Sequence, residues 1–376
     1  MKWRDSSGTC MMEAMGANTS RWTTVLDHLV GALPYEGRLV LINGPDLLAD
    51  RLAEHLRDTG RPCIRLTAGV CADPEDGGWP ALTSAAVVVA GPEWRDRVPD
   101  GVWHLTVWAR TRHTDPPHTT PPHTEPPNAE PSHTEPSHTE PSHTEPPGES
   151  GQSAHVVLDL HDVDWPVIRH IDPELVPNEV WYRSESRAFF AARAATWDTK
   201  FGADLPAYAA AIAESDLLTG GVAVDVGCGT GRALPALRDA VGPAGTVFGV
   251  DHTPQMLATA RDRARECGAM LLQADARHLP FAPGSVDAIF AAGLINHLPS
   301  AASGLRELAR IARTGARLVL FHPSGRASLA ARHGRTLHPD EPLAEHVLRA
   351  TTADTGWRLT VYDDAEHRFL AAATRA

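Results

Sequence analysis

Residues 111–150, near the middle of the chain, cannot belong to any hydrophobic core. They hold 11 of the 31 prolines and six of the 20 histidines, and they include no Val, Ile, Leu, Met, Phe, Trp, Tyr or Cys. From residue 116 to residue 145 they read as six pentads: PPHTT, PPHTE, PPNAE and three copies of PSHTE. Because such a segment has no apolar surface to bury, we predict a disordered, extended spacer. The chain must therefore fold from the sequence on either side of it.

The pentads contain five histidines, and imidazole is a common ligand of zinc, copper and nickel. A metal site built here would require chain without a fixed fold to lose conformational entropy on binding, so we favour a spacer with solvated histidines. The sequence has no HEXXH motif, and its five cysteines form no CxxC pair. We therefore predict no metal site.

Length, charge and cysteine usage narrow the class of protein. A chain of 376 residues with 42% hydrophobic residues predicts two domains. The net charge of -13 disfavours a nucleic-acid partner and an anionic membrane surface. The odd number of cysteines suits a reducing compartment, and neither a secretory h-region nor a run of about 18 apolar residues occurs. The expected location is the cytoplasm.

An alternating α/β pattern precedes the spacer. Apolar runs predict strands and one amphipathic helix, with strands at 38–43, 62–66, 85–90 and 102–108 and the helix at 47–59. Residues 155–160, after the spacer, read as one more strand. The simplest interpretation is a small α/β domain with a parallel sheet, residues 1–110 with 151–175, that holds the spacer in the loop before its final strand. A plain interdomain linker is the alternative.

The second domain, residues 176–376, begins with helices and continues as regular β/α alternation. Five apolar strands are predicted at 222–226, 246–251, 269–273, 286–291 and 317–321, with helices near 233–240, 254–267 and 303–313. This alternation predicts a doubly wound, Rossmann-like parallel sheet. Residues 357–362 and 368–374 are joined by too short a run for a crossover helix, so we expect an antiparallel hairpin that completes a seven-stranded sheet.

The chemistry is concentrated in VDVGCGTG, which follows the first strand of this second domain. Its glycines, Gly227, Gly229 and Gly231, allow a sharp turn that a ligand can approach closely. The spacing GxGxG does not match the dinucleotide fingerprint GxGxxG, and the GK[ST] of a phosphate-binding P-loop is missing. A nucleoside ligand without phosphate follows from this pattern.

Three carboxylates follow strands of the same sheet. Asp251 ends the second strand, where a carboxylate can bind two ribose hydroxyls. Asp275 follows the third strand and can read an adenine edge together with a backbone amide, and Asp225 lies before the glycine turn. Carboxylates around a ligand suggest that the ligand is positively charged, such as a sulfonium or an ammonium.

VDVGCGTG, GVDHTPQML, LQADARHLPF, GSVDAIFAAGLINHLP and ELARIARTGARLVLF occur in this order. They resemble the successive motifs of class I S-adenosylmethionine-dependent methyltransferases, over roughly residues 178–376. The resemblance implies S-adenosylmethionine as the cofactor, with these contacts: the methionine part at Asp225, Gly227, Gly229 and Gly231, the ribose at Asp251, and the adenine at Asp275 and Ala276. It also implies that Trp197, followed by Asp198, closes over the cofactor.

Several of these residues keep a purely structural interpretation. Asp225 could simply fix the glycine turn, and Cys228 reads as a small loop residue, because methyl transfer from a sulfonium needs no covalent enzyme intermediate. Arg277 and His278 are interpreted as solvent-facing. Trp181 and Tyr182 either line a substrate cavity or pack the helical segment.

A general base is needed only if the methyl acceptor must lose a proton. His297 and His322 are the candidates, because both lie where the fourth and fifth strands end, at the cleft edge of an open α/β sheet. Either histidine could equally cap a helix or satisfy a buried backbone group.

The first domain resembles a uridine-kinase-like P-loop domain in GRLVLINGPDLLADRLAEHLRDTGRPCIRL and AHVVLDLHDVDWPVIRHI. Its turn lacks the glycine-lysine-Ser/Thr of a phosphate site, and Asp46 and Asp50 would repel a triphosphate. We predict a degenerate, non-catalytic P-loop-like domain.

The predicted function is in-line methyl transfer from S-adenosylmethionine to a small-molecule acceptor, with no nucleic-acid or membrane partner. A homo-oligomer stays open. The alternative is a non-catalytic scaffold or binding protein that joins a kinase relic to a cofactor-binding module.

Overall fold

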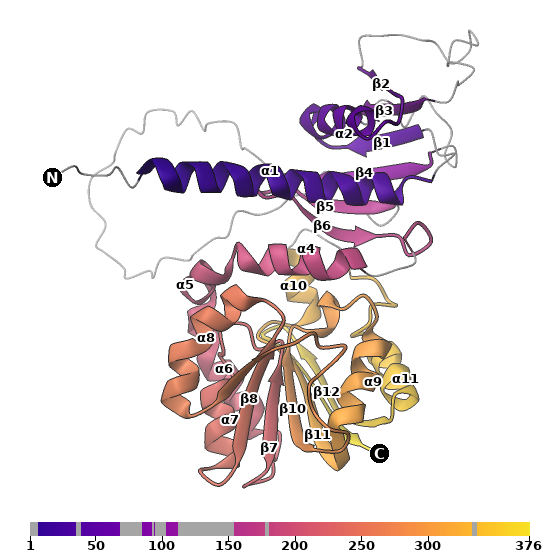
Figure 1. Cartoon of the computed structure of the whole chain (residues 1–376). Coiled ribbons are helices and arrows are strands. Elements are labelled where there is room, and N and C mark those ends of the chain that lie inside the picture. The colour runs from indigo at the N-terminus through magenta and orange to yellow at the C-terminus, as the bar shows by residue number, and fades with distance from the viewer. Residues whose placement is uncertain are drawn as a thin grey trace, which may run out of the picture. The chain divides into compact units, whose positions relative to one another are not determined.

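The computed structural model describes residues 7–34, 39–67, 85–91, 94, 103–111, 154–176, 180–332 and 337–376 (Figure 1). The chain divides into two compact units, Met1–Leu175 with Ala331–Arg335 and Val176–Ala330 with Thr336–Ala376. Residues 112–150 of the predicted spacer lie outside the described part of the chain, so its disorder stays a prediction.

The first unit contains one six-stranded sheet in the order β2-β3-β1-β4-β5-β6. Its elements are α1 (Ser7–Ala32), β1 (Leu39–Asn43), α2 (Asp46–Asp58), β2 (Cys63–Leu66), β3 (Ala86–Ala90), β4 (Leu105–Arg110), β5 (Val156–Asp159) and β6 (Val167–Ile171). β5 pairs in parallel with β4, so strands from both sides of the predicted spacer form one sheet. The sequence reasoning missed α1 and β6, and β6, antiparallel to β5, is the last strand of this sheet.

Helix α2 forms where leucines recur every fourth residue. Leu48, Leu52 and Leu56 are all buried, so one stripe of the helix faces the core. The turn before α2 is tight: a Cβ on Gly44 would lie 2.5 Å from the Cβ of Ala109 on β4. The space between the end of β1 and β4, where the strand order of this sheet reverses, is therefore filled by packing.

The second unit contains the predicted seven-stranded sheet, in the order β12-β13-β11-β10-β7-β8-β9. Its strands are β7 (Val222–Val226), β8 (Thr246–Asp251), β9 (Met270–Gln273), β10 (Val286–Ala292), β11 (Ala312–His322), β12 (Trp357–Ala365) and β13 (Arg368–Arg375). β13 is antiparallel to both of its neighbours, β11 and β12. The Rossmann-like sheet and its C-terminal antiparallel hairpin are thus confirmed.

Helices cover both faces of this sheet (Figure 1). The helices of this unit are α4 (Val180–Ala191), α5 (Trp197–Phe201), α6 (Leu205–Ala213), α7 (Leu234–Val241), α8 (Pro254–Cys267), α9 (Ala301–Ile311), α10 (Arg326–Arg332) and α11 (Glu345–Asp354). One hydrophobic cluster packs the sheet against α9 and α11, and the other packs it against α6, α7 and α8. Ala223 and Val224, neighbours on β7, belong to different clusters, as alternation along a strand buried on both faces requires.

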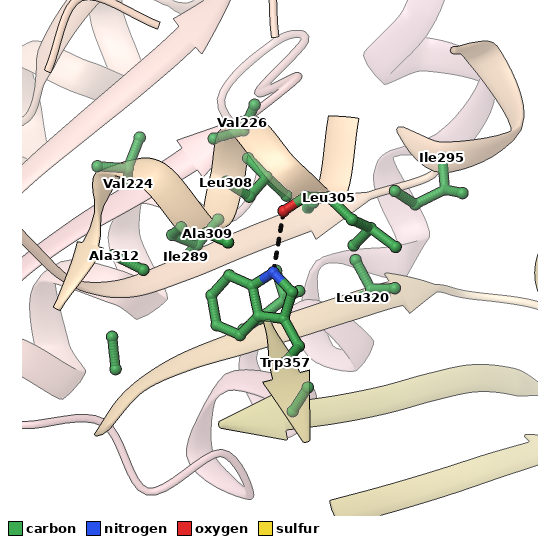
Figure 2. Close-up of a cluster of buried hydrophobic side chains, with 14 of the residues drawn as sticks. Val224, Val226, Ile289, Ile295, Leu305, Leu308, Ala309, Ala312, Leu320 and Trp357 are labelled. Carbon is green, nitrogen blue, oxygen red and sulfur yellow. Dashed lines mark hydrogen bonds between the residues drawn. The ribbon is translucent and has the colours of Figure 1, made fainter. Parts of the chain in front are cut away.

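Trp357 ties the C-terminal hairpin to the rest of this core (Figure 2). Its side chain is 2% exposed, and its indole Nε1 donates a hydrogen bond of 3.0 Å to the carbonyl oxygen of Leu305 on α9. The first residue of β12 therefore contributes both apolar burial and a buried hydrogen bond to a helix on the sheet face.

Replacing Trp357 with alanine is expected to lower the free energy of unfolding by about 3–5 kcal/mol, because it leaves a cavity in the core. Trp357→Phe loses the hydrogen bond and is expected to cost about 1 kcal/mol. Val361→Ala serves as the control, since Val361 lies on the same strand and is 46% exposed. Urea unfolding of the full chain measures all three, and equal losses for Trp357→Ala and Val361→Ala would contradict this assignment.

Candidate functional site

The glycine turn connects β7 to α7 at the carboxyl edge of the second sheet. Gly227, Gly229 and Gly231 have φ values of +74°, +52° and +80°, which disfavour residues with a Cβ. The backbone N–H groups of Gly227 and Cys228 donate to the carbonyl oxygen of Val250 at 2.8 and 3.0 Å. The turn is thereby fastened to the end of β8.

The three glycines face different surroundings. A Cβ on Gly231 would lie 2.9 Å from Leu234 Cδ1, and one on Gly227 would lie 3.1 Å from Leu294 Cδ1. A Cβ on Gly229 would meet no heavy atom within 4 Å. A side chain at Gly227 or Gly231 would therefore have to displace a leucine side chain, whereas Gly229 borders open space that a ligand can fill.

Asp251, at the end of β8, holds this turn in place. One carboxylate oxygen accepts from the N–H of Gly229 at 2.9 Å, and the other accepts from the N–H of Thr253 at 2.8 Å. The sequence left a turn-fixing role open for Asp225, but the structure gives it to Asp251. Each oxygen of a carboxylate has a further lone pair, so Asp251 can still accept from a ligand hydroxyl.

Asp225 lies at the end of β7 and is 2% exposed. Among the described residues its carboxylate accepts no hydrogen bond. Burial, with a smaller contribution from the nearby charge of Asp251, raises the pKa of Asp225 to about 8. A buried carboxylate with no partner is unfavourable when ionised, so this position favours a ligand that brings a positive charge.

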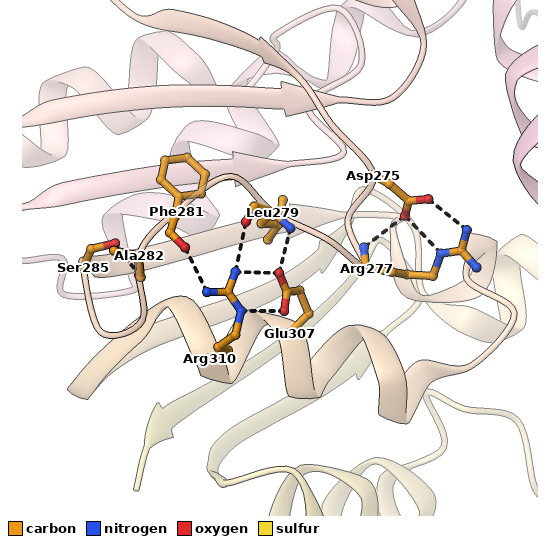
Figure 3. Close-up of polar contacts among 8 residues, drawn as sticks. All are labelled: Asp275, Arg277, Leu279, Phe281, Ala282, Ser285, Glu307 and Arg310. Carbon is orange, nitrogen blue, oxygen red and sulfur yellow. Dashed lines mark hydrogen bonds and ion pairs between the residues drawn. The ribbon is translucent and has the colours of Figure 1, made fainter.

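Asp275, predicted to read the adenine, is held by Arg277 (Figure 3). The Arg277 backbone N–H and Nε donate to Oδ1 at 3.0 Å each, and Nη2 donates to Oδ2 at 2.8 Å. Burial raises the pKa of Asp275, but the hydrogen bonds and charge of Arg277 outweigh it, so the pKa of Asp275 is lowered overall. Ala276 between them is partly buried.

Arg277 is not solvent-facing, contrary to the sequence interpretation. Its side chain is 15% exposed, and its guanidinium carbon lies 5.1 Å from the ring centroid of Tyr182 on α4. The sequence gave no sign of this contact, because the two residues lie far apart along the chain. His278 is exposed, as interpreted.

The helical segment before the sheet lies against the glycine turn. Trp197, the first residue of α5, has its ring 5.9 Å from Phe190 and 5.0 Å from Phe201. Asp198 accepts a hydrogen bond of 2.6 Å from the hydroxyl of Thr230, within the turn. The predicted Trp-Asp element and the predicted glycine turn are thus brought together.

The two candidate bases lie in different surroundings. His297 ends the short 3₁₀ helix η5 (Ile295–His297), and its ring centroid is 5.0 Å from that of Phe190 on α4. His322 is the last residue of β11, and its Nδ1 lies 3.1 Å from the backbone nitrogen of Ser324. Only His322 lines the cavity described next.

A small, open cavity lies where β10 and β11 end. Its lining is mostly apolar, and the residues are Ala291, Gly293, Leu294, Ile295, Asn296, Leu320, Phe321, His322, Ser324, Arg326, Leu329, Leu343 and Phe369. Leu294 belongs to this lining and also limits the space above Gly227. The cavity therefore adjoins the glycine turn.

His252, directly after Asp251, was missed by the sequence reasoning. Within the ranges that the structure describes, its Nε2 is buried without a hydrogen-bond partner, as is the hydroxyl of Thr253. Burial lowers the pKa of His252, while the charges of Asp251 and Asp275 oppose that shift. Its place beside the predicted ribose carboxylate was the signal that could have identified it.

Within the described ranges, no group of three or more His, Cys, Asp or Glu side chains could hold a metal ion. No helix in the same ranges is long and apolar enough to cross a membrane.

Residues 224–320 match the model of a family described as "Methyltransferase domain". The chain is 38% identical over 109 residues to the methyltransferase GfsG of Streptomyces halstedii, covering 28% of this chain and 38% of that protein. It is 32% identical over 114 residues to a demethylmenaquinone methyltransferase of Shouchella clausii, and this match covers 30% of this chain and 48% of that protein. An uncharacterized 37.1 kDa protein in transposon TN4556 of Streptomyces fradiae is 36% identical over 109 residues, covering 29% and 32%. The chain thus spans about a third to a half of these relatives.

Solved structures give matches over about half of the chain. A SAM-dependent methyltransferase from Aquifex aeolicus is 25% identical, with a TM-score of 0.38 over 43% of this chain and 86% of that one. A putative S-adenosyl-L-methionine-dependent methyltransferase from Methanococcus maripaludis is 17% identical, with a TM-score of 0.41 over 50% and 93%.

The matched residues include the glycine turn, Asp251 and Asp275. The cofactor predicted from the sequence is S-adenosylmethionine, and the chain's own residues fit it. Gly229 borders open space, and the carboxylate of Asp225, which has no hydrogen-bond partner among the described residues, suits the positive charge of the cofactor's amino-acid end.

The pKa of Asp225 makes cofactor binding depend on pH. Below pH 8 the ligand-free protein holds this carboxyl protonated, whereas a cationic ligand favours the ionised form, so binding should release a proton. The association constant of S-adenosylhomocysteine, the demethylated product, is expected to rise with pH between about 6 and 8, by up to tenfold per unit, and then level off. Calorimetry in buffers of different ionisation enthalpy measures the proton release.

Asp225→Asn is the control for this pH dependence and should abolish it. Because folding raises the pKa of Asp225, ionisation of this group removes stability as the pH rises toward 8. The variant should therefore increase the free energy of unfolding of the ligand-free protein at pH 8, and much less at pH 4. A pH slope that persists in Asp225→Asn would assign the proton to another group.

Proposed function

We propose that the C-terminal unit transfers the methyl group of S-adenosylmethionine to a small-molecule acceptor by in-line displacement. When bound, the cofactor supplies an electrophilic methyl group on a sulfonium. The observation that carries the proposal is the buried carboxylate of Asp225, which has no hydrogen-bond partner in the described part of the chain, beside a glycine turn that borders open space. The chain then has to orient the two reactants and exclude water.

The proposed cofactor contacts follow the edge of the sheet. The amino-acid end lies at Asp225 and the glycine turn, and the ribose at the remaining lone pairs of Asp251. The adenine lies near Asp275 and Ala276, where Arg277 fixes the carboxylate. Trp197 directly precedes Asp198, which is bonded to Thr230 of the turn, and it covers the amino-acid end.

The acceptor is proposed to occupy the cavity at the ends of β10 and β11. Its mostly apolar lining with a few polar side chains suits a small organic molecule rather than a nucleic acid or a folded protein. The net charge of -13 agrees with this choice. One relative is named for demethylmenaquinone, itself a small molecule.

Between the two candidate bases, we favour His322, because it lines this cavity, whereas His297 packs against Phe190. Its role is to take a proton from an acceptor that must lose one.

The first unit is proposed to be a non-catalytic, P-loop-like domain within residues 1–110 and 151–175. Asp46, in the first turn of α2, and Asp50 both form ion pairs with Arg65. A carboxylate therefore already occupies the helix end where a phosphate would bind, and the adjoining turn is filled by packing. A cytoplasmic location is part of the proposal.

Gly229→Ala tests the cofactor site. Gly229 and Gly268 have φ values of +52° and +67°, and a Cβ on either would meet no heavy atom within 4 Å. Both alanine variants should therefore lose a similar stability of about 1 kcal/mol. Only Gly229→Ala is expected to weaken S-adenosylhomocysteine binding, by about tenfold or more, because its methyl group enters the ligand space. Equal affinities would place the cofactor elsewhere.

His322→Gln tests the proposed base. Methyl transfer to small acceptors with an ionisable hydroxyl is expected to fall by about 10²–10⁴ in kcat, with S-adenosylhomocysteine affinity unchanged. His297→Gln, the comparison variant, should lower kcat less than tenfold. A full chain that binds the cofactor product and methylates no acceptor in a broad panel would favour the scaffold alternative.

A further inference from the structure

Helix α5 depends on polar contacts for its position. It has five residues and none of them is buried, although the Trp197 ring packs against Phe190 and Phe201. Asp198 accepts a hydrogen bond from Thr230 in the glycine turn. Two arginines from outside the helix supply further polar contacts.

The first is Arg263, on α8. Its Nη1 donates to the carbonyl oxygen of Thr230 at 2.5 Å, and its Nη2 donates to Asp198 Oδ2 at 2.9 Å. The Thr230 hydroxyl donates to the other oxygen of Asp198 at 2.6 Å. Three residues from α5, the glycine turn and α8 thus form a closed triangle of hydrogen bonds.

The second is Arg232, which directly follows the glycine turn and is 6% exposed. Its Nη2 donates to the carbonyl oxygen of Phe201, the last residue of α5, and lies 3.6 Å from Asp204. Its guanidinium carbon lies 4.9 Å from the ring centroid of Tyr208. Hydrogen bonds therefore fix α5 at both ends, from Arg263 in its first turn and from Arg232 at its last residue.

Of these two arginines, Arg263 also donates a hydrogen bond to the glycine turn itself. Thr230 lies between Gly229 and Gly231, and its carbonyl and hydroxyl both belong to the triangle. The side chains of Arg263 and Asp198 are only 23% and 33% exposed, so water screens their attraction less than it screens a surface pair. A guanidinium can bridge the two acceptors because it has several donors in one rigid plane.

We propose that Arg263 is a positioning residue for the amino-acid end of the cofactor. It does not touch the cofactor itself. It holds Thr230, and hence the turn around Gly229, in the geometry that receives the ligand, and it holds Asp198, and with it the start of α5, beside that turn. The adenine end has its own support in the Asp275–Arg277 pair and does not depend on Arg263. This inference rests on the proposed cofactor site.

Two ligands separate this role from a general loss of structure. S-adenosylhomocysteine carries the amino-acid part, whereas 5′-methylthioadenosine has the same nucleoside without it. In the full chain, Arg263→Gln is expected to raise the dissociation constant of S-adenosylhomocysteine about tenfold and that of 5′-methylthioadenosine less than about twofold. Titration calorimetry measures both constants.

Arg265→Gln is the matched control. Arg265 lies on the same helix and forms an ion pair with Asp262 in which the two side chains are 74% and 81% exposed. This variant removes the same charge and should change neither constant by more than about twofold. Asp198→Asn is the second test variant: it should reproduce the selective loss, and combining it with Arg263→Gln should add little, because both break the same contact.

Equal weakening of both ligands by Arg263→Gln, or no weakening of either, would overturn the inference while leaving the proposed function intact. Additive losses in the double variant would overturn it as well. Absence of S-adenosylhomocysteine binding to the unchanged protein would instead overturn the proposed function, and this inference with it.

Discussion

Two carboxylates meet where β7 and β8 end, and the site depends on how each is compensated. The Asp251 carboxylate accepts hydrogen bonds from two backbone N–H groups, one of which belongs to the glycine turn. Asp225 receives no such compensation among the described residues, and its pKa rises to about 8. Asp251 therefore fixes the shape of the turn, whereas the charge of an ionised Asp225 has no compensating group beside the turn in the described part of the chain. In the proposed function, that uncompensated charge stabilises the bound cofactor at the expense of the ligand-free protein.

Much of the second unit could be predicted from the sequence, because its pattern is local. Buried strands appear as apolar runs, and the short link between the last two leaves only a hairpin. The glycine turn could be located because its φ values restrict the residue types allowed there. Strand β6 of the first sheet was missed, because its short apolar run is interrupted by Arg169 and His170.

The side-chain partners could not be predicted. Asp198 and Arg263 are 65 positions apart, and many other acidic and basic pairs in the sequence were equally plausible. The turn-fixing role of Asp251 and the Arg277–Tyr182 contact are of the same kind, because they depend on which loops meet at the sheet edge. Sequence reasoning thus located the elements that carry the site, whereas the contacts that orient them required the fold.

The pairing of β4 with β5 has a consequence for how this chain can vary. Closing a loop costs only about 0.6 kcal/mol more for each doubling of its length. Gain or loss of whole pentads between these two strands would therefore be nearly neutral for stability. Likewise, a backbone cut within this connection would leave both fragments joined through one sheet, so a nicked molecule would elute as an intact one until it is denatured.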